Sequence, residues 1–373
     1  MFNLGKQNLD ILQYWLKIGD DDQGKGYIAS VNKYLERDLK EDDLDVLKKF
    51  LDLCYLASWS VAGINIGEKV AIISKKLLGS QHSLTLNFLG KLANFFSDTS
   101  DYEKAQTLYL RVLKNQEKNL GKSHVETLDT VNNLGVLFHD KGDYKKAEEF
   151  YRRSINGNEI TLGREHPTTL TAIGNLALTM SVIGKYQEAG LLYNRKLKAQ
   201  ETNLGYEEYD TLVTANKLAF MYQYIEEYKQ AEDLFVRALD GFKKTLDPDH
   251  SDISNVTNNL AELYKDSGDF EKAIEYYSAS INLREKYLGT NEYDTLVSVF
   301  NLALVYQNIK KYKKAEELFI RTLDGLKLLD PEHNNIITVI NNLTNLFKNT
   351  GNIEKEKFYS EKAKIIEDKF KNN

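Results

Sequence analysis

Hydrophobic and polar residues recur along most of this chain with a period of 42 residues. The clearest repeat runs over residues 120–161, LGKSHVETLDTVNNLGVLFHDKGDYKKAEEFYRRSINGNEIT. One alanine returns at the same place in six successive repeats, as Ala105, Ala147, Ala189, Ala231, Ala273 and Ala315. A leucine followed by Ala or Gly returns with the same spacing, at Leu92, Leu134, Leu176, Leu218, Leu260 and Leu302. A period of this length is typical of stacked structural repeats.

Each repeat predicts two antiparallel helices. In the repeat at 120–161, apolar residues stand three or four positions apart over 128–138 and again over 144–155. Gly142 and Asp143 separate the two runs. Small residues allow the helices to approach closely, and large ones fill the space between repeats. A single repeat cannot bury both of its faces, so stacking supplies the stability. We therefore predict an all-α fold.

The repeats divide the chain into two parts. We predict seven of them, the last with a charged capping helix at its end: 78–119, 120–161, 162–203, 204–245, 246–287, 288–329 and 330–373. The seventh begins after a one-residue deletion. Repeats 204–245 and 288–329 match each other closely, which indicates a duplication of two repeats.

Residues 1–77 do not fit the period cleanly. Their apolar spacing predicts helices over residues 9–17, 27–39, 43–60 and 68–77, with a turn marked by Gly63 and Gly67. The last two helices resemble a degenerate repeat. We interpret residues 1–77 as a helical N-terminal cap of the stack. The alternative is a small helical module with a partner of its own.

Composition narrows the class of protein. The net charge is −6 and the pI about 5.7, which gives no reason to expect nucleic acid or an anionic membrane as a partner. The most apolar run, 55–67, is shorter than the roughly 20 residues that span a bilayer, and no signal peptide is recognised. The single cysteine, Cys54, stands in an apolar helical stretch. It is expected in the core and fits a reducing compartment, so we expect a cytoplasmic protein.

The sequence gives little indication of catalysis. Five histidines occupy the same linker position before the first helix of a repeat: His82, His124, His166, His250 and His333. We expect turn or cap residues, because stacked repeats hold them too far apart to share a metal. Phosphate-binding, dinucleotide and nucleophile motifs are absent. We therefore expect no enzyme activity, with no catalytic residues, cofactor or metal. Arginines on the second helices are expected to pair with glutamates of neighbouring helices: Arg111, Arg153, Arg195, Arg237 and Arg321.

The pattern L-[GA]-x-x-[FYM]-x-x-x-G-x-[YF]-x-x-A-x-x-x-[YF] resembles the tetratricopeptide repeat over about four fifths of the chain. The period of 42 instead of about 34, the long second helix and the LGxxHxxT linker resemble the kinesin light chain type. The resemblance implies a right-handed α-solenoid of stacked helix-turn-helix repeats, whose first helices line a concave groove. A helical N-terminal segment followed by such a groove is also similar in layout to bacterial peptide-responsive regulators of the Rap type.

The groove residues follow from this resemblance. Residues one and two places before the core leucine, or two places after it, should face the groove. The predicted set is Asn132, Asn133, Asn175, Asn216, Lys217, Phe220, Asn258, Asn259, Phe300, Asn301, Leu304, Asn341 and Asn342. Asparagine both donates and accepts hydrogen bonds, and the resemblance implies that it holds peptide backbones here. The alternative is that the asparagines bridge neighbouring first helices. Lys91 and Lys217, which replace Asn, are where we expect specificity.

The predicted function is a non-catalytic scaffold or adaptor that binds a protein or peptide partner in the concave groove. One alternative is a peptide- or signal-responsive regulator that acts through the N-terminal helical module. An enzyme or enzyme subunit is the third. The sequence identifies neither the partner nor the oligomeric state.

Overall fold

The computed structural model describes residues 28, 31–36, 39–330 and 334–371, and every regular element in these ranges is a helix. The helices are α3 (Glu41–Leu56), α4 (Ser60–Leu78), α5 (Ser83–Asp98), α6 (Tyr102–Asn119), α7 (Val125–Asp140), α8 (Tyr144–Thr161), α9 (Pro167–Val182), α10 (Tyr186–Asn203), α11 (Tyr209–Tyr224), α12 (Tyr228–Thr245), α13 (Ser251–Asp266), α14 (Phe270–Tyr287), α15 (Tyr293–Asn308), α16 (Tyr312–Leu329), α17 (Asn335–Thr350) and α18 (Ile353–Lys371).

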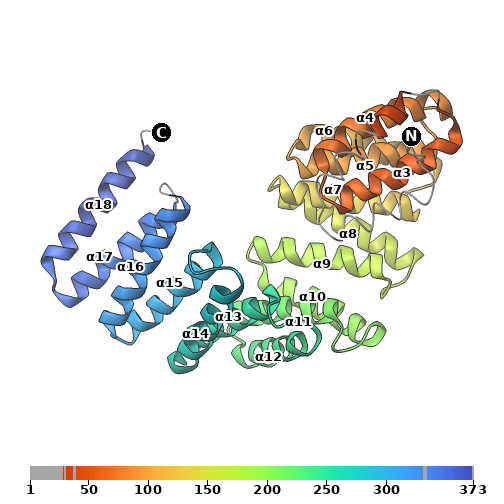
Figure 1. Ribbon diagram of the computed structural model, residues 1–373. Helices are drawn as coiled ribbons and strands as arrows, with labels where there is room; N and C mark the ends of the chain where they lie inside the picture. The colour runs from red at the N-terminus through yellow and green to blue at the C-terminus, as the bar shows by residue number, and fades with distance from the viewer. Residues whose placement is uncertain (1–27, 29–30, 37–38, 331–333, 372–373) are drawn as a thin grey trace. The chain divides into compact units, whose positions relative to one another are not determined.

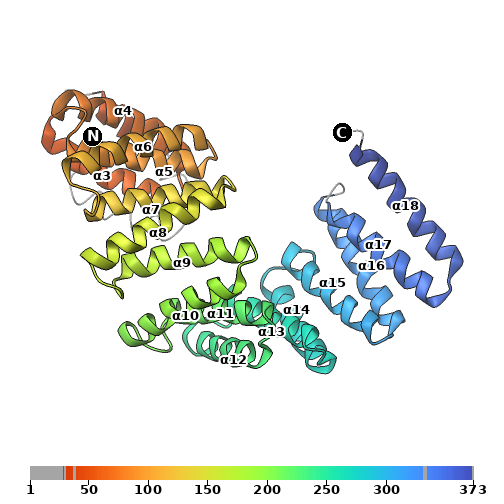
Figure 2. The ribbon, with the colours of Figure 1, turned by 180° about the vertical axis from the view of Figure 1, so that it is seen from behind.

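The helices alternate between two kinds with the period predicted from the sequence. The first helix of each repeat, from α5 to α17, has 16 residues and is called an A helix. The second, from α6 to α16, has 18 residues and is called a B helix. Figures 1 and 2 show the helices following one another as hairpins. The predicted all-α solenoid of helix-turn-helix repeats is therefore confirmed.

The chain forms two compact units, residues 1–184 and 185–373, which we call the N-terminal half and the C-terminal half. In the N-terminal half, neighbouring A helices α5 and α7, and α7 and α9, contact each other. In the C-terminal half, α13 and α15 do the same, and side-chain hydrogen bonds join α11 to α13 and α15 to α17. The A helices of each half thus form a continuous surface, which we call the A-helix face.

The periodic residues form the core. All six periodic alanines are 0% exposed, and the six leucines are at most 6% exposed. In the repeat at 120–161, the residue after the leucine is glycine, and a neighbouring side chain occupies the space beside it. At Gly135, a methyl group would lie 2.6 Å from the ring of Tyr151. The close helix approach predicted from the small residues is therefore present.

One prediction for the N-terminal part is wrong. Gly63 and Gly67 do not mark a turn, because α4 runs through both of them. A Cβ at Gly63 would lie 2.5 Å from the ring of Phe95 on α5, so this glycine makes room for a neighbouring helix. Tertiary packing therefore outweighed the local turn signal. The predicted helix at 9–17 lies outside the described residues, and the division of the chain at residue 77 stays a prediction.

The last helix presents polar residues where the preceding B helix presents core residues. On α16, Phe319 and Leu323 are at most 3% exposed. The equivalent positions of α18 are occupied by Ser360 and Lys364, and both are exposed. The equivalence allows for the one-residue deletion at the start of the seventh repeat. A polar outer face is what the terminal repeat of a stack requires for solubility.

Candidate binding surface

Four of the predicted asparagines join neighbouring A helices. The Asn175 side-chain amide on α9 donates to the Asn132 oxygen on α7 (3.4 Å), and Asn259 on α13 donates in the same way to Asn216 on α11 (3.1 Å). In both pairs, the donor stands directly before the core leucine of its own repeat. The acceptor stands two places before the core leucine of the preceding repeat. Each pair uses one N–H and one oxygen, so each amide keeps further hydrogen-bonding capacity. The bridging role is therefore present at these four positions.

A fifth asparagine belongs to a polar network beneath the surface. Asn258 is buried and its oxygen accepts from the Ser298 hydroxyl (2.8 Å). Ser298 in turn accepts from Arg284 of α14 (2.7 Å), which also donates to Asn255 (2.7 Å). Arg284 is only 6% exposed, and its burial lowers the pKa of the guanidinium. This network ties α13, α14 and α15 together and fixes the A-helix face from below.

Other asparagines remain available to a partner. Asn133 and Asn301 are half-buried and Asn341 is exposed, and none of these three amides makes a hydrogen bond within the described residues. Asn342 donates to the Thr338 carbonyl of its own helix (2.9 Å). A half-buried amide with no internal partner presents donors and an acceptor at the surface.

The two lysines that replace asparagine differ in their surroundings. Lys91 forms an ion pair with Asp52 of α3. Lys217 on α11 is exposed and forms no ion pair with any described residue. It lies near Lys196 of α10, where burial first and the Lys217 charge second lower the pKa of the Lys196 amine. An anionic group placed between these two amines would relieve their repulsion.

The three predicted apolar residues of the surface have one side in the core. Phe220 packs edge-on against Phe235 (ring centroids 5.2 Å apart) and Phe300 packs against Phe319 (5.5 Å). Leu304 packs on the core cluster formed by α15 to α18. All three are half-buried, so each also leaves apolar surface next to the asparagines.

Two predicted residues meet at a cavity. It has a volume of about 250 Å³ and is lined by residues of α15, α16 and α17, among them Phe300 and Asn301. Its other apolar walls are Leu296, Leu326 and Val339. At the rim, a hydrogen bond joins the Asn335 amide to the Tyr293 hydroxyl (2.6 Å). The other residues that line the cavity were not predicted from the sequence: Tyr293, Leu296, Val297, Thr322, Leu326, Asn335, Thr338 and Val339.

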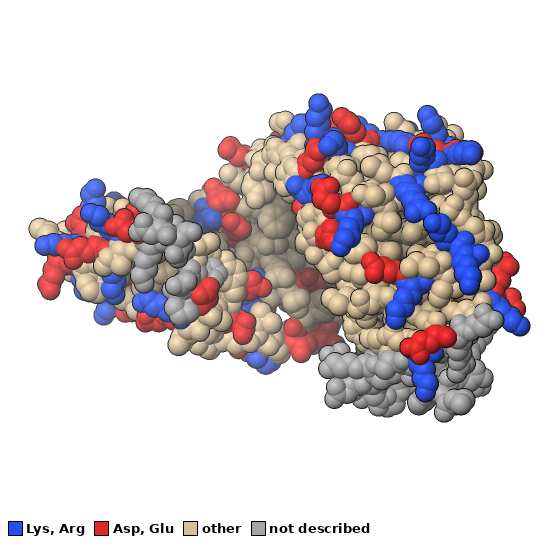
Figure 3. Space-filling view, turned by 90° about the horizontal axis from the view of Figure 1, so that it is seen from above, with Lys and Arg blue, Asp and Glu red and all other residues tan. Residues whose placement is uncertain are grey.

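The predicted arginine pairs lie on the B helices and contribute to stacking. Arg153 pairs with Glu117 at 2.5 Å. Arg237 pairs with Glu201, and Arg321 with its equivalent Glu285. The prediction is confirmed at these three positions. In each half, basic and acidic side chains are interspersed over the face seen in Figure 3, as expected of a solvated surface.

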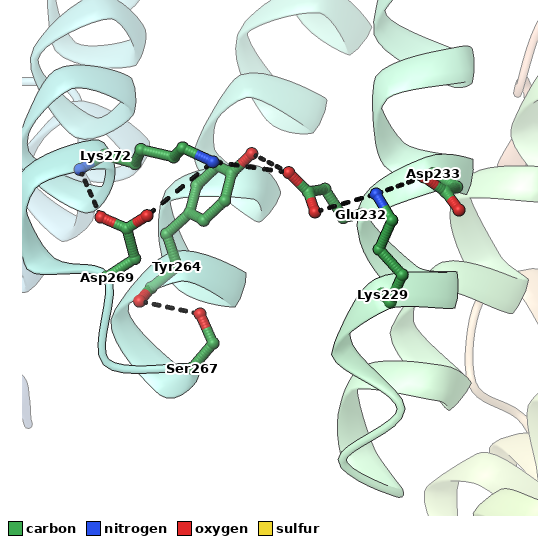
Figure 4. Close-up of polar contacts among 7 residues, drawn as sticks. All are labelled: Lys229, Glu232, Asp233, Tyr264, Ser267, Asp269 and Lys272. Atoms are coloured by element: carbon green, nitrogen blue, oxygen red, sulfur yellow. Dashed lines mark hydrogen bonds and ion pairs between the residues drawn. The ribbon is translucent and has the colours of Figure 1, made fainter.

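A further polar cluster joins α12, α13 and α14 (Figure 4). The Tyr264 hydroxyl donates to Glu232 (2.7 Å), while Lys229 and Lys272 lie 3.5 and 3.6 Å from the same carboxylate. The hydrogen bond from Tyr264 is the main reason why the pKa of Glu232 is lowered. The Lys272 amine also lies over the Tyr264 ring, 4.6 Å from its centroid. The cluster holds successive repeats together.

The periodic histidines are structural. His82, His124, His166 and His250 each cap an A helix, because the imidazole Nδ1 accepts from the backbone N–H two residues later. The prediction of cap residues is confirmed for these four, and His333 lies outside the described residues. Cys54 is fully buried on α3, as predicted, and burial raises the pKa of its thiol to about 12.

No three His, Cys, Asp or Glu side chains of the described ranges converge in a metal-binding arrangement. No helix in the described part of the chain combines the length and apolarity needed to cross a membrane.

Comparisons with known proteins identify the type of repeat. Residues 84–160, 210–286 and 298–320 match family models described as tetratricopeptide repeats. No curated protein sequence matches the chain. Among solved structures, the repeats of a putative kinesin light chain from Podospora anserina are 24% identical. They cover 56% of this chain and 98% of theirs, with a TM-score of 0.51.

Two further solved structures cover more of the chain. The apo form of the quorum sensor NprR from B. thuringiensis is 13% identical and covers 97% of this chain and 98% of its own, with a TM-score of 0.62. A Rap protein complexed with competence and sporulation factor is also 13% identical. It covers 89% of this chain and 99% of its own, with a TM-score of 0.52. At these identities, the likeness concerns the fold alone.

Proposed function

This chain is a tetratricopeptide repeat protein with 42-residue repeats like those of the kinesin light chain type, and from this premise we propose that it is a non-catalytic interaction protein. Its ligand is a peptide or a segment of a partner protein, bound along the A-helix face. One observation carries the proposal: Asn301 lines an apolar cavity on that face. The Asn301 amide has no hydrogen-bond partner within the described residues.

The two kinds of asparagine divide the work of binding. Pairs such as Asn216 with Asn259 fix the spacing of the A helices, so the surface is preorganised before the ligand arrives. Unpaired amides of the C-terminal half such as Asn301 and Asn341 hydrogen-bond the main chain of an extended segment. Lys217 attracts an anionic group of the ligand. Affinity then comes from side chains placed against the apolar surface between these amides.

The chemistry of the described residues supports a non-catalytic role. The thiol of Cys54 is buried and its raised pKa keeps it protonated, so it is a poor nucleophile. The periodic imidazoles are used as helix caps. A lone buried cysteine also fits a reducing compartment, and we place the protein in the cytoplasm.

A regulator is the second candidate. It is supported by the coverage of nearly the whole chain by NprR, described as a quorum sensor, and by a Rap protein complexed with competence and sporulation factor. In this version, the bound peptide changes how residues 1–77 are presented. Limited proteolysis separates the two: a ligand that changes cleavage within residues 1–77 favours the regulator, and unchanged cleavage favours the scaffold.

The experiment that tests the proposal is selection from a random peptide display library on the full chain, followed by affinity measurements on the selected peptides. Asn301→Ala removes an unpaired amide of the A-helix face, and losing hydrogen bonds worth about 1 kcal/mol each should weaken binding about 5- to 10-fold. Asn282→Ala is the matched control, because Asn282 is exposed on the B helix α14. The proposal fails if the selected peptides bind both variants as tightly as the wild type.

A further inference from the structure

The cavity coincides with one difference between the duplicated repeats. In residues 204–245, the ring of Phe242 is buried and packs against Tyr209, with ring centroids 5.7 Å apart. In residues 288–329, Tyr293 is retained at the position of Tyr209, but Leu326 stands in place of Phe242. Leu326 and Tyr293 both line the cavity of about 250 Å³. The later repeat therefore lacks a ring at the place where the earlier one carries it.

The surroundings of the two positions agree at four lining residues and differ at five besides Leu326, among them Phe300 in place of Asn216 and Thr322 in place of Ala238. In both repeats, a leucine of the A helix packs against a glycine of the B helix: Leu212 against Gly241, and Leu296 against Gly325. The neighbouring A helix contributes Val256 in the earlier case and Val339 in the later one. The leucine and the valine that the two places share thus pack beside a phenylalanine ring in the earlier repeat.

Size and polarity support the same occupant. An apolar cavity of about 150 Å³ accepts benzene, so about 250 Å³ has room for an aromatic side chain. Leu296, Leu326 and Val339 are buried apolar residues of the lining, and Asn301 and Thr338 are among its polar residues. No lining residue carries a charge at neutral pH, so a buried charged side chain would find no counter-ion there.

We propose that this cavity binds an aromatic side chain of phenylalanine size from the partner peptide. The partner supplies the ring that Phe242 supplies in the earlier repeat. The unpaired Asn301 amide hydrogen-bonds the peptide main chain beside the ring. This inference rests on the proposed function and deepens it, because it names the residue class that anchors the peptide.

The decisive variant is Leu326→Phe, which fills the cavity with the residue of the duplicate repeat. Thermal unfolding of the variant checks that the fold accommodates the ring. Leu328→Phe makes the same change two residues along α16, at a side chain that is 74% exposed. Peptides selected on the full chain should share an aromatic residue. Leu326→Phe should weaken their binding 10- to 100-fold, and Leu328→Phe should leave it unchanged.

A second measurement does not depend on a variant. Adding N-acetyl-L-phenylalanine methylamide to the methyl-labelled full chain should shift the methyl signals of Leu296 and Val339 upfield through the ring current. The alanine analogue should leave these signals in place. Equal responses to the two probes would overturn the inference.

The failure of this inference is distinct from failure of the proposed function. If the selected peptides lack an aromatic residue, lose affinity with Asn301→Ala and are indifferent to Leu326→Phe, the cavity assignment is wrong while A-helix-face binding stands. If binding is indifferent to both changes, the proposed function and the inference fail together.

Discussion

The sharpest stability prediction compares two asparagines at equivalent positions of neighbouring repeats. Asn259→Ala removes a hydrogen bond to Asn216, whereas Asn301→Ala removes none within the described residues. Both changes replace a mediocre helix former with the best one. The two variants therefore have the same change of side chain, and they differ in whether an internal hydrogen bond is lost.

The magnitudes follow from that difference. Loss of the bond costs about 0.5–1.5 kcal/mol, and alanine returns up to about 0.7 kcal/mol of helix propensity. We expect Asn259→Ala to destabilise its region by about 0.5 kcal/mol. Asn301→Ala should stabilise its region by a similar amount, so the two variants should differ by about 1 kcal/mol.

Native-state hydrogen exchange is the suitable assay, because long repeat arrays do not unfold as one cooperative unit. The free energy of opening should fall for amides of α13 in Asn259→Ala and should not fall for amides of α15 in Asn301→Ala. As a control, Asn216→Ala should match Asn259→Ala, and the double variant should add little. Equal losses of opening free energy in α13 and α15 would refute the division between bridging and available asparagines.

The remaining predictions concern packing, backbone conformation and pH. Gly241→Ala should destabilise by about 1–3 kcal/mol, because the new methyl would lie 2.5 Å from a leucine on α11. Gly90→Ala, with nothing within 4 Å, should instead stabilise by about 0.5–1 kcal/mol; chemical denaturation compares the two. Glu226 has φ 63° where four other repeats carry glycine, so Glu226→Gly should raise the melting temperature by relieving left-handed strain of about 1–2 kcal/mol. Tyr264→Phe removes the hydrogen bond that lowers the pKa of Glu232. Its loss of stability should be full above the ordinary carboxyl pKa, near 4.5, and should shrink as the pH falls through the lowered value, in a series of melting temperatures against pH.

The sequence predicted the fold because the information is repeated in it. Each periodic alanine and leucine appears six times, and the same burial is required every time, so the core positions were visible without any knowledge of contacts. The histidine caps were predicted for the same reason. Gly63 and Gly67 were misread because they occur once, outside the period, and because a glycine used for close packing resembles one used for a turn.

The candidate surface was predicted less completely. The A-helix positions follow from the period, but the choice between bridging and available asparagines depends on the residue opposite and on its other partners, since Asn258 opposite Asn301 accepts from Ser298. Asn259 has Asn216 across the interface, whereas Asn342 faces the position of Phe300, which cannot accept its hydrogen bond. The cavity was missed because its lining comes from three helices, including Thr322 and Leu326 on the B helix α16, and no single repeat position marks it.

If the ligand lies along the A-helix face, a bound peptide must be close to residues of the A helices. A selected peptide carrying a nitroxide label should be added to the methyl-labelled full chain. The account predicts that the label broadens the methyl signals of Val297 and Val339 on the A helices and spares that of Leu328 on the outer side of α16. Broadening of Leu328 with sharp signals from Val297 and Val339 would contradict it.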